Sequence, residues 1–411
     1  MEQEELIPHL FRTEYSKITS VLCKCFGFGQ SEIAEDIASD TFLTAAQTWP
    51  LNGIPQNPTA WLYNVAKNKA KNYLQRNSVF KNKITPGIKN SSTNLFESET
   101  EIDLSPQNIS DSQLQMMFAI CHPSISAEAQ IGLSLRILCG FGIEEIADAF
   151  LTNKETINKR LFRAKEILRE GKIKIEIPGP AEIDQRLNAV LTTIYLLFSE
   201  GYYSTSQNQT IRKELCFEAM RLCTMLIDNI NTNTPPVNAL LALMCFHASR
   251  FDARIGKDGE IILYDEQDTS LWNNGLISRG AHFLNAAASG TKISKYHLEA
   301  AIAYWSTRKE DTREKWDNVL QLYNRLLQIE YSPIAALNRT YALSKANGKQ
   351  EAIREAEKLQ LTNNHFYFVL LGDLYTGIDD QKAKQNFQKA FFLAKTQPDR
   401  QSIQKKIDNF H

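Results

Sequence analysis

The stretch EEIADAFLTNKETINKRLFRAKEIL, residues 144–168, carries the strongest local pattern in this chain. Its first part predicts one short helix from three apolar residues: Ile146, Ala147 and Phe150. The tripeptide Leu151-Thr152-Asn153 then interrupts this helix, and a second apolar stripe follows at helical spacing: Ile157, Leu161, Ala164 and Leu168. Two short helices joined by a three-residue break are typical of a helix-turn-helix.

The polar side of the second helix has the composition of a surface that reads DNA. Asn153 is a suitable N-cap for this helix, because its side chain can accept a hydrogen bond from a free backbone N–H. Five side chains fall away from the apolar stripe, as a reader of the major groove requires: Thr156, Asn158, Lys159, Phe162 and Arg163. The alternative is a solvated helix face with ordinary charges, and the complete motif favours DNA reading.

Residues 59–74 form a second amphipathic segment, which is basic and rich in asparagine. One arc of the predicted helix is polar and contains Asn64, Lys67, Asn68, Lys71 and Gln75. The opposite arc is apolar and contains Leu62, Val65, Ala66, Ala70 and Tyr73. Lysines neutralise phosphates, amides bond to exposed base edges and aromatic rings stack on bases, so the segment favours melted or single-stranded DNA.

The net charge of −1 conceals a strong internal asymmetry. Residues 1–58 contain eight acids and three bases, whereas residues 59–96 contain seven bases and no acid. Residues 97–111 are acidic again, and residues 151–174 contain eight bases against three acids. Such basic stripes attract a polyanion although the whole chain is nearly neutral, which makes nucleic acid a candidate partner.

The length of 411 residues predicts two to four domains. Hydrophobic residues at 43% and charged residues at 23% are near the averages of soluble globular proteins. The sequence has no apolar run of about 18 residues, and the N-terminal MEQEELIPHL lacks the basic and apolar parts of a secretory signal. We therefore expect a cytoplasmic protein with no membrane partner.

Seven cysteines are an odd number, scattered through apolar helical stretches, which argues against a disulfide framework. A zinc site could use Cys23, Cys25, Cys121 and His122, but their spacing lacks the paired motifs of zinc ligands, so buried thiols are favoured. Three neighbouring acids suggest metal ligands, a docking patch or a solvated loop with a helix cap, and we favour the last: Asp265, Glu266 and Asp268. The chain has no phosphate loop or nucleophile elbow. Neither an enzyme nor a cofactor is expected.

Apolar spacing predicts helices over 6–26, 31–48 and 59–77, and the proline-rich stretch 49–58 predicts a loop between the last two. The polar stretch after residue 78 predicts a flexible linker. Helical periodicity resumes afterwards and, past a proline-containing connector, continues to the end. The predicted division is a domain 1–78, a linker 79–110, a domain 111–175 and a helical extension 181–411.

Two segments near the C-terminus repeat at an offset of 34 residues. The first copy contains Ile334, Leu337, Asn338 and Tyr341. The second copy contains Phe368, Leu371, Gly372 and Tyr375. This is the period of tetratricopeptide helix hairpins, which we expect from about residue 297 onward. An ordinary helical bundle with coincidental spacing is the alternative.

Three segments in order resemble the extracytoplasmic function (ECF) sigma factors of bacterial RNA polymerase. AEDIASDTFLTAAQTW (34–49) is similar to their polymerase-binding helix, PTAWLYNVAKNKAKNYLQR (58–76) to their −10 element helix, and residues 144–168 to their −35 helix-turn-helix. The resemblance covers about residues 1–175. It implies an all-α protein with a sigma-2-like domain, a linker and a sigma-4-like domain.

The resemblance also assigns roles to individual residues. Contacts with the β′ clamp of core RNA polymerase fall on Asp36, Ser39, Asp40 and Phe42, although Ser39 replaces a commoner Gln. Asn68 matches the position that captures a flipped −10 base, and the full −10 set is Asn64, Lys67, Asn68, Lys71 and Asn72. The −35 set is Thr156, Asn158, Lys159, Phe162 and Arg163. Leu151 stands where the family often has glycine.

The extension is similar to that of an ECF subgroup with long tetratricopeptide-like C-terminal helices. The implied function is promoter-specific transcription initiation, with promoter DNA and core polymerase, through its β′ clamp and β flap, as partners. A regulatory protein is a further candidate partner for the repeats. The alternatives are a stand-alone helix-turn-helix regulator with a repeat-based sensor, and a scaffold in which DNA contact is incidental.

Overall fold

The computed structural model describes residues 3–84, 102–203, 209–254, 262, 264–395 and 397–410. Within these residues all regular secondary structure is helical, which confirms the predicted all-α fold. No helix among them is both long and apolar enough to span a membrane. The chain divides into two compact units, Met1–Thr232 and Asn233–His411, and each is described by itself.

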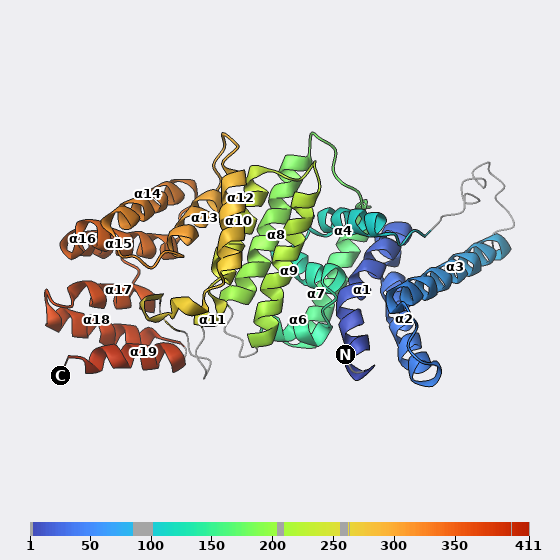
Figure 1. Ribbon diagram of the computed structural model, residues 1–411, viewed down its shortest axis with the longest axis horizontal. Coiled ribbons are helices and arrows are strands. Elements are labelled where there is room, and N and C mark those ends of the chain that lie inside the picture. Colours follow the sequence, from blue (N-terminus) through green and yellow to red (C-terminus); the bar gives the residue numbers. More distant parts are fainter. Residues whose placement is uncertain are drawn as a thin grey trace. The chain divides into compact units, whose positions relative to one another are not determined.

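The first unit begins with three long helices (Figure 1): α1 Gln3–Phe26, α2 Ser31–Asn52 and α3 Pro58–Ile84. A single 3-10 turn, Phe28–Gln30, joins the first two. Helix α1 packs against both α2 and α3. It contributes a stripe of side chains that are fully buried: Tyr15, Ile18, Val21 and Leu22. These three helices therefore share one apolar core, as their spacing predicted.

The predicted loop 49–58 is wrong at its start, because α2 continues through Pro50 to Asn52. The helix ends at Gly53, whose φ of 84° is accessible to glycine and whose N–H bonds to the carbonyl of Trp49 at 2.9 Å. The Trp49 side chain is only 2% exposed and its ring lies 5.4 Å from that of Trp61. This aromatic packing outweighs the helix-breaking tendency of proline.

The next segment contains four helices: α4 Pro106–Ile120, α5 Ala127–Leu133, α6 Ile143–Ala149 and α7 Lys154–Glu170. A π-helical turn, Ser134–Leu138, extends α5. Helix α4 begins inside the predicted linker 79–110, because Ser105 accepts a hydrogen bond from the N–H of Asn108 and Pro106 starts the first turn. Of the predicted linker, residues 85–101 lie outside the described residues.

Helices α8 Ile183–Tyr203 and α9 Gln209–Asp228 lie side by side and pack on the preceding segment (Figure 1). Helix α8 contacts α4 and α5, and α9 contacts α4 and α6. Two polar contacts reinforce this packing: Thr193 donates to the Gln130 side chain at 2.7 Å, and Arg221 donates to the Leu138 carbonyl at 2.6 Å. The boundaries predicted at 78, 110 and 175 thus fall inside one compact unit.

The second unit starts with α10 Pro235–Ala248, which is buried on nearly every side and packs against α12 Asn274–Ala287 and α13 Lys295–Trp305. Three shorter turns lie between α10 and α12: α11 Phe251–Arg254, and the 3-10 turns Tyr264–Glu266 and Thr269–Leu271.

The remaining helices of the second unit follow one another in packed pairs: α14 Arg313–Ile329, α15 Pro333–Asn347, α16 Lys349–Leu359, α17 His365–Tyr375, α18 Asp380–Leu393 and α19 Gln397–Asp408. The repeat positions Leu337 and Leu371 are both buried. A Cβ at Gly372 would lie 2.6 Å from the ring of Phe387, so glycine permits the close approach of α17 and α18. The tetratricopeptide assignment of these hairpins stays a prediction.

Candidate nucleic-acid and polymerase interfaces

The helix-turn-helix is formed by α6 and α7, with residues 150–153 between them. Its turn is closed by backbone hydrogen bonds, among them Thr152 N–H to the carbonyl of Ala147 at 2.9 Å. Asn153 caps α7 as predicted, since its side chain accepts from the N–H of Thr156 at 2.8 Å. Leu151 has a φ of 49°, in the left-handed region that favours glycine.

Burial separates the two sides of α7 as the sequence predicted. The apolar stripe is buried and consists of Ile157, Leu161, Ala164 and Leu168. All five predicted −35 residues are exposed: Thr156, Asn158, Lys159, Phe162 and Arg163. Phe162 is 54% exposed, which is unusual for a large apolar side chain and suits contact with a base or a methyl group.

A groove of about 450 Å³ lies beside this exposed face. One wall is formed by α7 residues, including Thr156, Lys159 and Arg163, and the other by the turn that contains Ser124 and Ser126. Arg160 also lines the groove and was missed by the sequence reasoning, although its spacing of four residues from Thr156 puts both on one side of the helix. Hydroxyls and cations together give this groove the donors that phosphate contacts use.

Helix α3 has the amphipathic form that the sequence predicted. Leu62, Ala66 and Ala70 are fully buried. Four of the five predicted −10 residues are exposed, and Lys67 is half-buried: Asn64, Lys67, Asn68, Lys71 and Asn72. The structure therefore gathers these side chains on one accessible face of a single rigid helix.

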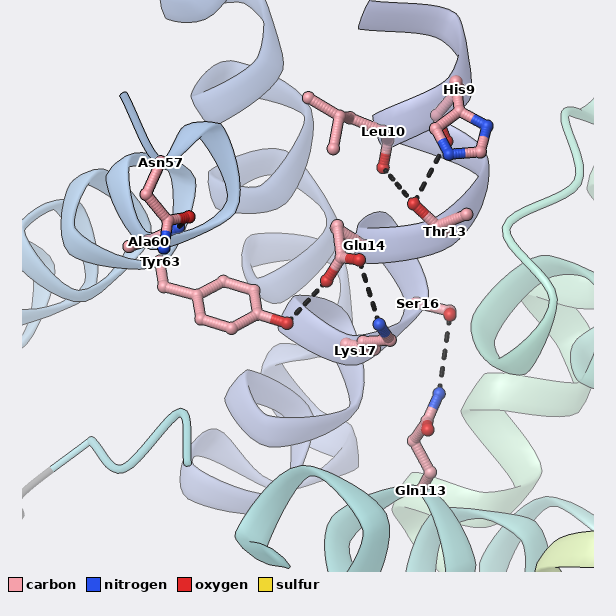
Figure 2. Close-up of polar contacts among 10 residues, drawn as sticks. All are labelled: His9, Leu10, Thr13, Glu14, Ser16, Lys17, Asn57, Ala60, Tyr63 and Gln113. Carbon is pink, nitrogen blue, oxygen red and sulfur yellow. Dashed lines mark hydrogen bonds and ion pairs between the residues drawn. The ribbon is translucent and has the colours of Figure 1, made fainter. Parts of the chain in front are cut away.

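Two polar contacts fix α3 against its neighbours. Tyr63 donates a hydrogen bond at 2.5 Å to Glu14 of α1, and Lys17 binds the same carboxylate at 2.9 Å (Figure 2). Burial, together with the bond to Glu14, raises the pKa of the Tyr63 phenol, so it remains a donor. Lys69, next to Asn68, binds Asp40 of α2 at 2.6 Å. These contacts set the orientation of the asparagine face.

The predicted polymerase-binding residues divide into two groups. Asp36, Ser39 and Asp40 lie exposed on α2. Phe42 does not share this face, because its side chain is 4% exposed and its ring lies 5.0 Å from that of Phe11 in the core. We therefore remove Phe42 from the predicted polymerase-binding residues. Leu43, which the sequence reasoning missed, is 53% exposed and follows Ser39 and Asp36 at helical spacing.

No group of three or more residues suited to hold a metal ion occurs in the described part of the chain. Burial raises the pKa of the Cys121 thiol to about 11, which keeps it protonated. Desolvation by neighbouring groups also raises the pKa of the Cys25 thiol, although this residue is exposed. Asp268 caps the 3-10 turn Thr269–Leu271 by accepting from the N–H of Ser270 at 2.9 Å, the role favoured for it.

Two segments of the chain match models of known protein families. Residues 10–79, which span most of α1 and continue into α3, match the family model "Sigma-70 region 2". Residues 186–288 match a family of unknown function, DUF6596. No solved structure matches the chain. An uncharacterized protein of Rhizobium meliloti (strain 1021) is 30% identical over 386 residues, covering 93% of this chain and 91% of the relative. The chain therefore belongs to the same protein family as this relative and carries a sigma-70 region 2 segment, which indicates a sigma factor of transcription initiation.

Proposed function

We propose that the protein is an ECF-type sigma factor, which binds core RNA polymerase and directs promoter-specific initiation. The observation that carries the proposal is the match of residues 10–79 to sigma-70 region 2. In support of it, three predicted polymerase-binding residues on α2 and four predicted −10 residues on α3 are exposed: Asp36, Ser39, Asp40, Asn64, Asn68, Lys71 and Asn72. Asp36, Ser39, Asp40 and Leu43 would contact the β′ clamp. Carboxylates around an exposed leucine suit a partner with a basic, partly apolar surface.

In this proposal α3 reads the melted −10 strand. Asn68 would capture an extruded base through its amide, while Lys67 and Lys71 neutralise the neighbouring phosphates. Asn64 and Asn72 lie one turn away on either side of Asn68 and would bond to adjacent nucleotides. The contact between Tyr63 and Glu14 would keep this face turned toward the strand.

Helix α7 would read the −35 duplex from the major groove. Arg163 and Asn158 can each make paired hydrogen bonds to a base edge, and Lys159 supplies a phosphate contact. The β flap of the polymerase would bind the same helix-turn-helix domain. For the C-terminal hairpins we propose a regulatory role through a protein partner, because stacked helix pairs form broad binding surfaces.

The runner-up is a stand-alone helix-turn-helix regulator, which would bind duplex DNA and ignore polymerase. Binding of the full-length protein to core polymerase separates the two. We expect tight binding by the wild-type protein and weakened binding by Leu43→Ala and Asp36→Ala, since both side chains are exposed on α2. Ile230→Ala, at a side chain that is 91% exposed outside the region 2 segment, is the control. Absence of any wild-type binding would favour the regulator.

A further inference from the structure

The segment that matches DUF6596 is divided between the two compact units. Residues 186–232 of the match lie in the first unit and residues 233–288 in the second. The first part contains nearly all of α8 and the whole of α9, which contact α4, α5 and α6 (Figure 1). These two helices therefore pack on the segment that contains the helix-turn-helix.

A buried hydrogen bond joins α8 to α5. Thr193 is 2% exposed and Gln130 is 8% exposed. The Thr193 hydroxyl lies 2.7 Å from Oε1 of Gln130 and 3.0 Å from the Ala189 carbonyl of its own helix. Nε2 of Gln130 donates to the carbonyls of His122 and Ile125 at 3.0 Å and 3.1 Å. Because the amide nitrogen faces two acceptors, Oε1 must accept, and the Thr193 hydroxyl is the donor that it needs.

The two carbonyls bound by Gln130 belong to the turn 121–126, which connects α4 to α5. This turn contributes three residues to one wall of the groove beside α7: Ser124, Ile125 and Ser126. Gln130 therefore fixes the backbone of the groove wall, and Thr193 fixes the amide of Gln130.

Two arginines of the same segment bind the carbonyl ends of neighbouring helices. Arg186 of α8 donates to the carbonyl of Phe118, in the last turn of α4, at 2.5 Å. Arg221 of α9 donates to the carbonyl of Leu138, the last residue of the π-helical turn, at 2.6 Å, and its Nε binds Glu218 at 2.8 Å. Carbonyls in the last turn of a helix have no partner within the helix, so these side chains satisfy them.

Helix α1 supports the same segment from α4 and the π-helical turn. One polar contact there is the hydrogen bond from Gln113 of α4 to the Ser16 hydroxyl of α1, at 3.4 Å. It joins α1 to the middle of α4, whereas the bond from Thr193 reaches Gln130 and, through it, the turn 121–126. The two contacts can therefore be separated by mutation.

We propose that α8 and α9 are a structural part of the helix-turn-helix domain, and that Thr193 and Gln130 are positioning residues for the wall of the −35 groove. This rests on the proposed function, which assigns the groove to promoter DNA. The turn 121–126 presents hydroxyls and backbone N–H groups to a phosphate, so its fixed position strengthens binding to every −35 sequence alike. The first part of the DUF6596 segment thus serves DNA binding without contacting DNA.

Hydrogen exchange of the full-length protein, measured by mass spectrometry, tests the contact itself. Thr193→Val keeps the shape of the side chain and leaves Oε1 of Gln130 without its donor. Peptides covering residues 121–130 should then exchange about ten-fold faster. Thr193→Ser keeps the hydroxyl and should exchange at the wild-type rate. Thr192→Val is the matched control, because Thr192 is exposed and its hydroxyl donates to the Asn188 carbonyl of the same helix at 2.9 Å.

Promoter binding by core RNA polymerase combined with the full-length protein tests the link to DNA. Thr193→Val should weaken binding about three- to ten-fold, by the same factor on every single-base −35 variant, because the turn contacts phosphate rather than bases. Thr193→Ser should restore the wild-type affinity. Thr193→Val should add no further loss to Gln130→Leu, since both remove the same anchor. Ser16→Ala, at the contact of α1 with α4, should leave the exchange of residues 121–130 unchanged.

Unchanged exchange in a Thr193→Val variant that circular dichroism shows to be folded overturns the positioning role. Equal acceleration in Thr193→Val and Thr192→Val, or in Thr193→Val and Ser16→Ala, leads to the same conclusion. Faster exchange with unchanged promoter binding overturns the role in DNA binding. If the wild-type protein with core polymerase binds no promoter, the sigma factor assignment fails and the link to DNA fails with it, while hydrogen exchange still decides whether α8 holds the turn.

Discussion

Replacing Tyr63 with phenylalanine should loosen α3 from α1 without changing the shape of the ring. The variant loses the 2.5 Å hydrogen bond to Glu14, a carboxylate that is 7% exposed (Figure 2). Hydrogen bonds to charged groups contribute about 1.5–3 kcal/mol. Because Tyr63 is half-buried and Lys17 still binds Glu14, we expect a cost near the lower value, about 1.5 kcal/mol. This corresponds to about a ten-fold increase in local opening.

Hydrogen exchange measured by mass spectrometry on full-length protein tests this expectation. Peptides covering residues 58–77 should exchange about ten-fold faster in Tyr63→Phe. Tyr73→Phe is the control, since Tyr73 is on the same helix and its ring lies 5.6 Å from that of Phe26, a contact that phenylalanine keeps. Equal exchange in Tyr63→Phe and wild type would refute the reasoning, and so would equal acceleration in both variants.

Four further predictions concern the faces on α3 and α7, the turn and the extension. Asn68→Ala should reduce promoter melting, seen by permanganate footprinting, while polymerase binding is kept. Arg163→Ala should cost about 1–3 kcal/mol at one −35 base pair, whereas Lys159→Ala should weaken all −35 variants alike in a binding series. Leu151→Gly should stabilise the protein by up to about 1 kcal/mol in urea titrations, because a φ of 49° costs leucine about 1–2 kcal/mol and glycine loses part of that gain in chain entropy. Truncation after Lys174 should strongly reduce transcription at matched protein concentrations, because it removes α8 and α9 from α4, α5 and α6.

The helices and their exposed faces were predictable from the sequence because apolar spacing encodes both. The stripe from Ile157 to Leu168 identified α7 and left the five side chains of the proposed −35 set outside, and the structure shows them exposed. The same logic separated Leu62, Ala66 and Ala70 from the asparagines of α3. Local capping chemistry was equally readable, since Asn153 precedes the first turn of its helix.

Features that depend on tertiary contacts were not predictable. The family resemblance placed Phe42 among the polymerase-binding residues, yet its side chain is buried against Phe11 of another helix. Pro50 suggested a loop, but the packing of Trp49 on Trp61 keeps the chain helical. Gln130 and Thr193 are 63 positions apart, and no periodicity connects them. Such pairings arise only when the units of a fold are assembled.

Transcription by core RNA polymerase on a library of promoter sequences tests the central claim most directly. Core enzyme alone should give no specific transcripts, and addition of the full-length protein should produce transcripts that start at a fixed distance from a shared pair of sequence elements. Asn68→Ala and Arg163→Ala should both reduce the amount of transcript in this reaction. The loss in Asn68→Ala should depend on the −10 element, and the loss in Arg163→Ala on the −35 element. Transcripts that are unchanged by the protein, while it still binds duplex DNA, would contradict a sigma factor.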